Sequence, residues 1–374
     1  KQLFIFDTVL NDEEICNYTE IQNKMTNDLI KGRRLVLYGL RNTGKTSLLV
    51  SRVIPRLKKK NAIAIYADLF GVTSLEQLNG RLFQAIESAM TQYFPIKKKL
   101  DSLFHNLKSF RPVLKTDPID GMALSLEMAN NKTPNLSIIF DTLKTIHEKR
   151  PCVLILDEFQ DVHFVKEAEG LLRGEFQNLP SSFGLLLMGS KKHILSRIFT
   201  EPRAPLAGFG EDVEFPPIPY EEYHQYMSER FAQVKLKINL PTSTFLQNLM
   251  CRNPEAINIL CDQLVRLYHG PHTITEENVI KANQRVVDLR QSRFEEFLVH
   301  FSESEQKVLI AIAQNSPVAT PSGQEFVSKT RLSQKGVSKI VKKHLDGAVI
   351  YQTPEGFIIG DPLLAAYLRR YRKI

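Results

Sequence analysis

The sequence predicts an α/β fold in which helices cover both faces of a parallel sheet. Continuous apolar runs carry this prediction, because strands buried on both faces lose the alternation of apolar and polar residues. The runs lie at residues 35–38, 62–67, 153–156 and 185–188, and a shorter one lies at 213–215. Segments with helical spacing separate them, and strands that alternate with helices indicate a doubly wound sheet.

The first run leads into a glycine-bounded loop and then into a helix with Leu48, Leu49 and Val53 on its apolar face. This order is the context of a phosphate-binding loop, in which backbone N–H groups wrap an anion and glycines allow the close approach. The alternative is a chance glycine-rich turn. The loop predicts these nucleotide-binding residues: Gly39, Leu40, Arg41, Asn42, Thr43, Gly44, Lys45, Thr46 and Ser47.

Polar residues at the ends of two later runs complete the predicted site. Lys45 would reach the β- and γ-phosphates of ATP, and the Thr46 hydroxyl would ligate Mg²⁺. Asp157 follows a buried strand and would hold the metal or one of its waters, and Glu158 would polarise a water for attack on the γ-phosphate. The alternative is a strand that simply ends in acids at the solvent.

Ser190 ends the neighbouring run and is a third catalytic candidate, through contact with the γ-phosphate or the attacking water. A turn serine is an equally weighted alternative. An arginine from a neighbouring subunit would accelerate hydrolysis. The candidates are Arg173, Arg197 and Arg203, and each has a surface role as its alternative.

The rest of the chain divides into parts with different patterns. A lead-in helix is expected to start at residues 11–14 and to run towards Leu29. Ser74 and Gln77 predict a capped helix start. The broken pattern of 95–135 indicates loops and short pieces inserted over the nucleotide side of the sheet, and 219–290 shows only helical patterns. The expected parts are a lead-in (1–31), a core (32–218), a helical lid (219–295) and a winged helix (296–374).

The C-terminal part predicts a winged helix with a basic recognition helix. Ser302 and Glu305 form a capping box, Ser333 is expected to cap a later helix, and residues 348–352 and 356–359 would form the wing. From residue 329 onward there are ten Lys and Arg against three Asp and Glu, in a chain of net charge +8. This asymmetry predicts phosphate contacts with double-stranded DNA and little base readout. The DNA candidates are Arg331, Lys335, Lys339, Lys342 and Lys343.

Other readings of the basic helix stay open. Its lysines would also suit a solvated face on a domain that contacts proteins or clamps the core.

A separate lysine run lies at residues 58–60. It is interpreted as a helix end with cations favourably placed, and nucleic-acid contact is its alternative.

Composition narrows the class of protein. The 374 residues predict two or three domains, and 43% hydrophobic with 24% charged residues indicate a globular chain. No apolar run has transmembrane length and no signal peptide is recognised. The four cysteines are scattered, so neither a zinc site nor a disulfide framework is expected, and a cytoplasmic location fits best.

Several segments together resemble the archaeal-type ATPases, which belong to the AAA+/STAND group of P-loop ATPases. They are residues 35–48, 68–72, 157–160, 189–190, 253–254 and 361–363. The resemblance implies ATP and Mg²⁺ at the residues named above, in a sheet core followed by a helical lid and a winged helix.

This chain departs from that family at two places. Arg252 stands where a glycine is frequent, and it is a candidate phosphate contact or a surface arginine. Residues 208–210 lack a frequent arginine, which puts arginine-assisted hydrolysis there in doubt.

Three functions remain open at this point. The first is an ATP-hydrolysing switch that acts on DNA. The second is a signalling ATPase that assembles into a homo-oligomer with ATP and triggers a partner or effector protein, with the winged helix as its docking element. The third is a pure binding module with slow or absent hydrolysis, against which Glu158 argues.

Overall fold

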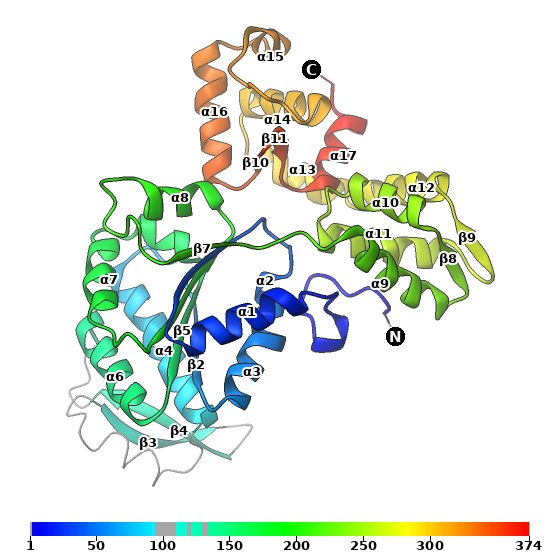
Figure 1. Ribbon diagram of the computed structural model, residues 1–374. Coiled ribbons are helices and arrows are strands. Elements are labelled where there is room, and N and C mark those ends of the chain that lie inside the picture. The colour runs from blue at the N-terminus through cyan, green and yellow to red at the C-terminus, as the bar shows by residue number, and fades with distance from the viewer. Residues whose placement is uncertain (1, 94–109, 118–120, 129–133, 374) are drawn as a thin grey trace. The chain divides into compact units, whose positions relative to one another are not determined.

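The computed structural model describes residues 2–93, 110–117, 121–128 and 134–373 (Figure 1). The chain forms two compact units. The sheet unit comprises Thr19–Gly39 and Thr46–Phe215, and the lid–winged-helix unit comprises Lys1–Tyr18, Leu40–Lys45 and Pro216–Ile374. No helix in the described ranges is long and apolar enough to cross a membrane.

The sheet unit contains five parallel strands. Their order is β2 (Ile63–Asp68), β5 (Cys152–Asp157), β6 (Gly184–Gly189), β1 (Arg34–Tyr38) and β7 (Glu211–Glu214). Every residue of β5 and β6 is buried, as expected of strands that are covered on both faces. The predicted doubly wound parallel sheet is therefore confirmed.

Helices lie on both faces of this sheet (Figure 1). On one face are α1 (Thr19–Ile30) and a continuous helical run made of α2 (Lys45–Leu48), the π-helical segment η2 (Leu49–Val53) and α3 (Ile54–Lys59). The opposite face carries α4 (Leu75–Tyr93), α6 (Leu136–Lys149), the 3₁₀ helix η3 (Phe159–Phe164), α7 (Ala168–Gln177) and α8 (Lys192–Thr200). These elements share one apolar core, in which Phe159 and Phe176 pack against each other.

Two local expectations for this half of the chain were wrong. The lead-in is not one helix, because Asn17 and Tyr18 have positive φ and a right-handed helix cannot continue through them. A 3₁₀ helix, η1 (Asp12–Glu14), precedes this break, and α1 follows it.

The insertion also differs from its prediction. Within 95–135, β3 (Phe110–Asp117) and β4 (Gly121–Met128) form an antiparallel hairpin, whereas residues 95–109, 118–120 and 129–133 lie outside the described residues. Strand β4 of the hairpin contacts α4, and Figure 1 shows the hairpin at the end of the sheet where the strands begin. It is therefore at the edge opposite to the carboxyl ends of the strands.

The lid–winged-helix unit begins with the N-terminal segment, whose fully buried Phe4 packs against Tyr226 and Phe231. The lid helices are α9 (Tyr220–Ala232), α10 (Leu240–Leu249), α11 (Pro254–Leu267), α12 (Glu276–Leu289) and α13 (Gln291–Val299). Contrary to the expectation of helices alone, β8 (Leu236–Ile238) pairs in parallel with β9 (His272–Ile274). Strands of three residues leave no measurable period in the sequence, so only their pairing reveals them.

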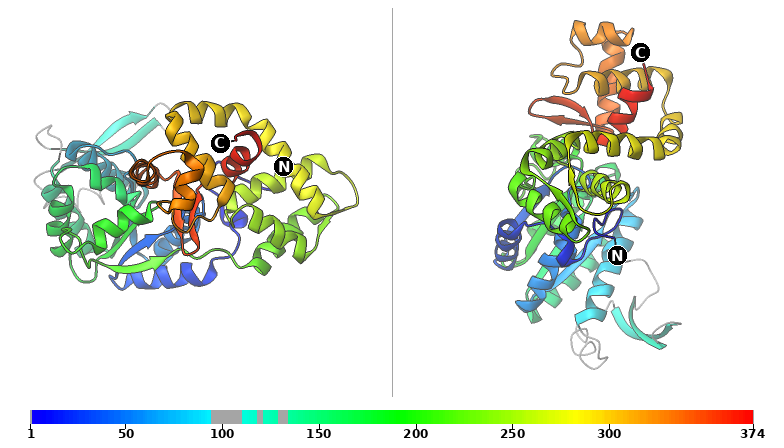
Figure 2. Two further views of the ribbon diagram at one scale, coloured as in Figure 1. Left: turned by 90° about the horizontal axis from the view of Figure 1, so that it is seen from above. Right: turned by 90° about the vertical axis from the view of Figure 1, so that its right-hand side faces the viewer.

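The winged helix follows in the same unit. Its elements are α14 (Glu303–Asn315), α15 (Gln324–Thr330), α16 (Gln334–Asp346), β10 (Ile350–Thr353), β11 (Gly356–Ile359) and α17 (Pro362–Tyr371) (Figure 2). The predicted capping box of Ser302 and Glu305 is present, and the Ser333 hydroxyl accepts from the Gly336 N–H at 3.1 Å. Val318 bridges to Phe357 beside the wing. The structure confirms the predicted winged-helix architecture.

Candidate functional site

The glycine-bounded loop folds around the ammonium of Lys45. Asn42 and Gly44 have φ of 60° and 91°, so the chain turns twice through a left-handed conformation before α2 starts. Nothing lies within 4 Å of a Cβ built on Gly44, so its positive φ rather than lack of space favours glycine there. The Lys45 side chain is buried, and its Nζ donates to the Leu40 carbonyl. The loop is thus pre-shaped around a positive charge.

Two side chains of the lid–winged-helix unit hold the backbone of this loop. The Tyr18 hydroxyl donates to the Thr43 carbonyl at 3.4 Å, and the Asn253 amide donates to the Arg41 carbonyl at 3.2 Å. Asn253 also caps α11, since its Oδ1 accepts from the Ala256 N–H. The Asn-Pro pair was noted in the sequence only as part of a resemblance, and Tyr18 carried no recognisable signal.

The strand ends of the sheet unit bring Thr46 and Asp157 together. The Thr46 hydroxyl donates to Oδ2 of Asp157 at 3.0 Å, although the residues lie 111 positions apart in the chain. The Tyr66 hydroxyl donates to the same oxygen at 3.0 Å, and the Glu158 N–H donates to Oδ1 at 2.8 Å. Burial, and then the Glu158 charge, raises the pKa of Asp157, while these three hydrogen bonds oppose the rise.

Glu158 is held by two polar side chains at the same edge of the sheet. Its Oε2 accepts from the Ser190 hydroxyl at 3.0 Å and from the Gln160 amide. Gln160 is buried, and a Cβ on Gly189 would lie 1.9 Å from its Oε1, so this glycine leaves room for the amide. Ser190 therefore lies beside the predicted water-polarising acid. The roles of Gln160 and Tyr66 were not predicted, because strand alternation alone does not show what a side chain contacts.

The arginines singled out from the sequence have different surroundings. Arg173 donates to the Ala207 carbonyl at 3.4 Å and its guanidinium stacks over Phe209. Arg203 is exposed, and Arg197 lies on α8. Arg252 donates to the Ile218 carbonyl at 2.6 Å and stacks on Tyr220, so its guanidinium is engaged within its own unit.

A cavity of about 470 Å³ lies within the lid–winged-helix unit. Its charged lining comes from the N-terminal segment, the loop, the lid and the winged helix, and comprises Asp7, Arg41, Glu255, Arg290, Arg293 and Asp361. Burial, a hydrogen bond with Asp7, and the Asp7 and Asp361 charges raise the pKa of Glu255 to about 7, although Arg290 opposes this. A hydrogen bond between two carboxyl groups requires one proton, which Glu255 is placed to carry.

We expect this cavity to make stability depend on pH near neutrality. In the unfolded chain Glu255 loses its proton at its ordinary lower pKa, whereas in the folded protein it keeps the proton up to about pH 7. The stabilisation is complete below the unfolded pKa and is lost as the pH rises through the folded one. Because solvent screens the partly buried Glu255, thermal melts at about pH 6 and about pH 8 should show a decrease in stability equivalent to about 1 kcal/mol or less.

The Glu255→Gln variant should remove most of that pH dependence. Exposed Glu277 of α12 provides the matched control, because Glu277→Gln makes the same chemical change outside the cavity. Equal pH dependence in wild type and Glu255→Gln would contradict the assignment.

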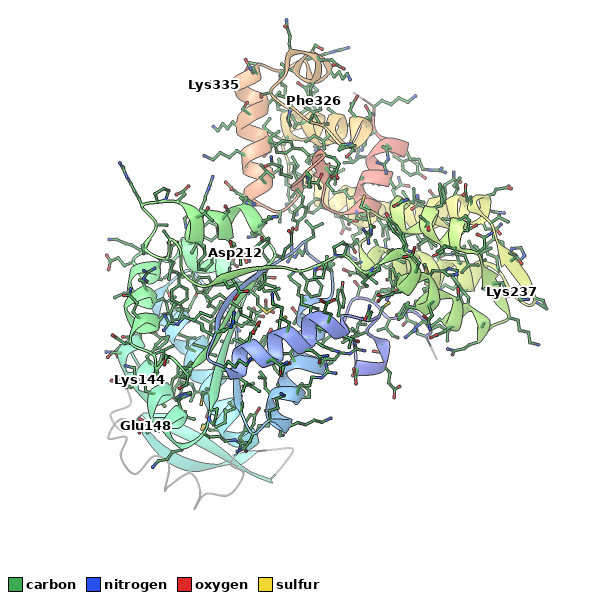
Figure 3. The ribbon with its side chains drawn as sticks, viewed as in Figure 1. Lys144, Glu148, Asp212, Lys237, Phe326 and Lys335 are labelled. Atoms are coloured by element: carbon green, nitrogen blue, oxygen red, sulfur yellow. The ribbon has the colours of Figure 1, made fainter. Side chains whose placement is uncertain are left out.

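The basic recognition helix corresponds to α16. Lys335, Lys339 and Lys342 are exposed on it, and Figure 3 shows Lys335 near its start. Arg331 is exposed at the end of α15, with φ of 56°. Lys343 is exposed as well, but its Nζ lies 2.6 Å from Oε1 of Glu305, whose side chain is only 9% exposed.

This ion pair gives Lys343 a partner that was not predicted. A hydrogen bond from Lys343, followed by those from Ser302, lowers the pKa of Glu305 to about 2. Replacing Lys343 with an acid would place two carboxylates together at a buried position, so the fold would not tolerate it as it would at the other three lysines. Lys343 therefore stabilises the winged helix through Glu305, and its contact with DNA stays a prediction.

Known proteins share this architecture. A family described as a probable winged helix domain matches residues 292–370. A Walker-type ATPase of Pyrococcus abyssi superposes with a TM-score of 0.66 at 19% identity, over 98% of this chain and 99% of that chain. The ORC1 protein of Aeropyrum pernix, solved in complex with DNA, superposes with a TM-score of 0.50 at 13% identity, over 98% and 95% of the two chains. No curated protein matches the sequence significantly.

The chain has the fold of a P-loop ATPase with a C-terminal winged helix. At these identities the likeness establishes architecture and leaves activity to be argued from the site. It confirms, at the level of fold, the resemblance to archaeal-type ATPases noted from the sequence. The ORC2 protein of Aeropyrum pernix in its ADP form superposes with a TM-score of 0.50 at 14% identity, over 98% of each chain.

Proposed function

We propose that this protein binds ATP with Mg²⁺, hydrolyses it, and uses the cycle as a switch that acts on DNA. The observation that carries the proposal is the hydrogen bond between Thr46 and Asp157, with the Glu158 carboxylate next to it. A loop threonine bonded to a buried carboxylate at the end of a parallel strand is the arrangement that P-loop ATPases use to hold magnesium. The Lys45→Ala and Glu158→Gln variants described in the Discussion test it.

The residues present fit a magnesium ion. Magnesium prefers oxygen ligands and keeps several waters, and Thr46 and Asp157 offer a hydroxyl and a carboxylate. The Thr46 hydroxyl can donate its proton to Asp157 and still offer a lone pair to a metal. Bound Mg²⁺ would neutralise charge on the β- and γ-phosphate oxygens.

Other side chains have distinct roles in this proposal. The Lys45 ammonium exchanges the Leu40 carbonyl for phosphate oxygens, and the loop N–H groups bind the anion. Glu158 orients the attacking water and accepts its proton, while Ser190 and Gln160 hold the carboxylate at the edge of the sheet. Hydrolysis then depends on positioning and charge stabilisation more than on covalent chemistry.

The case for DNA rests on α16. Three exposed lysines lie on the third helix of a winged helix, which is the helix that enters the major groove in related domains. The ORC1 neighbour, which shares the fold, was solved with DNA. Lysines give phosphate contacts, so we propose binding with little sequence preference.

A combined change of Lys335, Lys339 and Lys342 to Glu should weaken duplex binding to a similar extent for unrelated sequences. The plot of log affinity against log salt should become shallower by about one unit for each phosphate that the protein no longer neutralises. Fluorescence anisotropy across a salt series measures both effects.

The matched control changes Lys166, Lys237 and Lys281 to Glu, which alters the net charge equally at exposed lysines elsewhere. An equal reduction of affinity in this control would show that overall charge, and not the lysines of α16, accounts for the effect. If the wild-type protein does not bind duplex DNA even at low salt, the proposal that it acts on DNA is refuted.

A signalling ATPase is the second candidate, and one observation favours it. Asn253 of the lid holds the Arg41 carbonyl of the phosphate loop, and a single cavity joins this loop to the winged helix within one unit. Nucleotide-dependent movement of the loop would therefore reach the winged helix directly. Light scattering with ATP and with ADP tests it, since this candidate requires assembly into a homo-oligomer with ATP.

A further inference from the structure

Asp157 receives two hydroxyl donors on one oxygen. Thr46 at the start of the helical run and Tyr66 on β2 each donate to Oδ2 at 3.0 Å, and all three residues belong to the sheet unit. The Asp157 carboxylate is only 4% exposed, so water cannot replace a missing donor easily. Its orientation therefore depends on both hydroxyls.

The position of Tyr66 explains how it reaches this carboxylate. It pairs in register with Ile155, two residues before Asp157 on the neighbouring strand. Phenylalanine has the same ring and would therefore fill the same space without the bond. The Tyr66 hydroxyl donates to Oδ2 of Asp157 at 3.0 Å, so this bond depends on the hydroxyl and not on the ring.

Thr46 and Tyr66 differ in what metal binding asks of them. Thr46 is a proposed ligand, so its hydroxyl must turn towards the ion, whereas Tyr66 is not a proposed ligand and its hydroxyl can keep its position. Tyr66 can hold Oδ2 of Asp157 in place while the Thr46 hydroxyl turns.

We propose that Tyr66 is a positioning residue that sets the Mg²⁺ affinity of the Thr46–Asp157 pair. The inference rests on the proposed function and adds to it a residue that touches neither nucleotide nor metal. It predicts that removal of the Tyr66 hydroxyl reduces the contribution of magnesium to ADP affinity and leaves the contribution of the phosphate-binding loop unchanged.

The test compares ADP binding to Tyr66→Phe and wild type by calorimetry, in EDTA and across a Mg²⁺ series. Affinity in EDTA should be unchanged, because the loop is intact. The gain in affinity on adding Mg²⁺ should fall about tenfold, as expected when a charged group loses one hydrogen bond. The affinities in EDTA and in Mg²⁺ are compared for the same variant, so a general decrease in its stability affects both measurements alike.

Tyr93→Phe is the matched control. Its hydroxyl accepts from the Ala64 N–H at 3.3 Å, towards the other end of β2, and its removal should leave the magnesium gain unchanged. A titration of the Mn²⁺ electron paramagnetic resonance signal with ADP present measures metal affinity independently, and the same tenfold difference is expected there.

Several outcomes would overturn the inference, and they are distinguishable. If Tyr66→Phe gains as much ADP affinity on adding Mg²⁺ as wild type does, the role of Tyr66 is refuted while the proposed function stands. The same conclusion follows if Tyr93→Phe loses as much of this gain as Tyr66→Phe. A Tyr66→Phe variant that does not fold would show that the hydroxyl serves the fold instead. Wild-type protein that binds ADP no better with Mg²⁺ than with EDTA would overturn the proposed metal site itself.

Discussion

A Lys45→Ala variant is expected to lose ATP–Mg²⁺ binding almost completely. The Lys45 ammonium is buried inside the loop, whereas Arg41 lines the cavity of the lid–winged-helix unit. The variant therefore removes the buried cation of the loop, although the backbone N–H groups remain. Removal of charge-assisted hydrogen bonds to several phosphate oxygens should cost roughly a hundredfold or more in affinity. Calorimetric titration of ATP–Mg²⁺ measures it.

Lys59→Ala is the control for this experiment. Lys59 is exposed at the far end of the same helical run, so its replacement removes an equal charge without touching the loop. Unchanged affinity in Lys45→Ala would reject the phosphate-binding loop and with it the proposed function.

A Glu158→Gln variant should bind ATP normally and turn it over at least roughly a hundredfold more slowly. The substitution keeps the size of the side chain and its acceptor for Ser190, but it removes the carboxylate that takes the proton from water. Steady-state phosphate release, with and without duplex DNA, gives the turnover, and calorimetry gives the binding. The comparison separates the chemical step from nucleotide affinity.

Glu167→Gln provides the matched control, since Glu167 is exposed just beyond η3 and its carboxylate lies near Lys166 instead of the Asp157 cluster. Turnover at the wild-type level in Glu158→Gln would exclude Glu158 as the acid that positions water. Absence of turnover in the wild type, with every partner tried, would favour a binding module without hydrolysis.

Local sequence patterns predicted much of this architecture because the interactions behind them are local. A strand, a glycine-bounded loop and a helix follow one another within residues 34–59, and the capping box at Ser302 spans four residues. The juxtaposition of Thr46 and Asp157 is long-range, yet it was predictable. Carboxyl ends of parallel strands share one edge of a sheet, so polar residues that follow two such strands must converge.

Tertiary structure decided which side chains support these residues. The bond from Tyr66 to Asp157 depends on the register of β2 against β5, and the bond from Gln160 to Glu158 depends on the turn after β5. Period and composition carry neither the register nor the direction of a side chain.

The same limit applies outside the sheet unit. Lys343 is exposed like the other lysines of α16, but the packing of α14 against α16 gives it Glu305 as a partner. The cavity around Glu255 is lined by four segments that are distant in the chain. The pKa of Glu255 is raised because folding brings these segments together. The sequence by itself thus determined the fold class and predicted the residues of the candidate site. Only the tertiary structure decided their partners, because burial and charge act between residues that the chain brings together from afar.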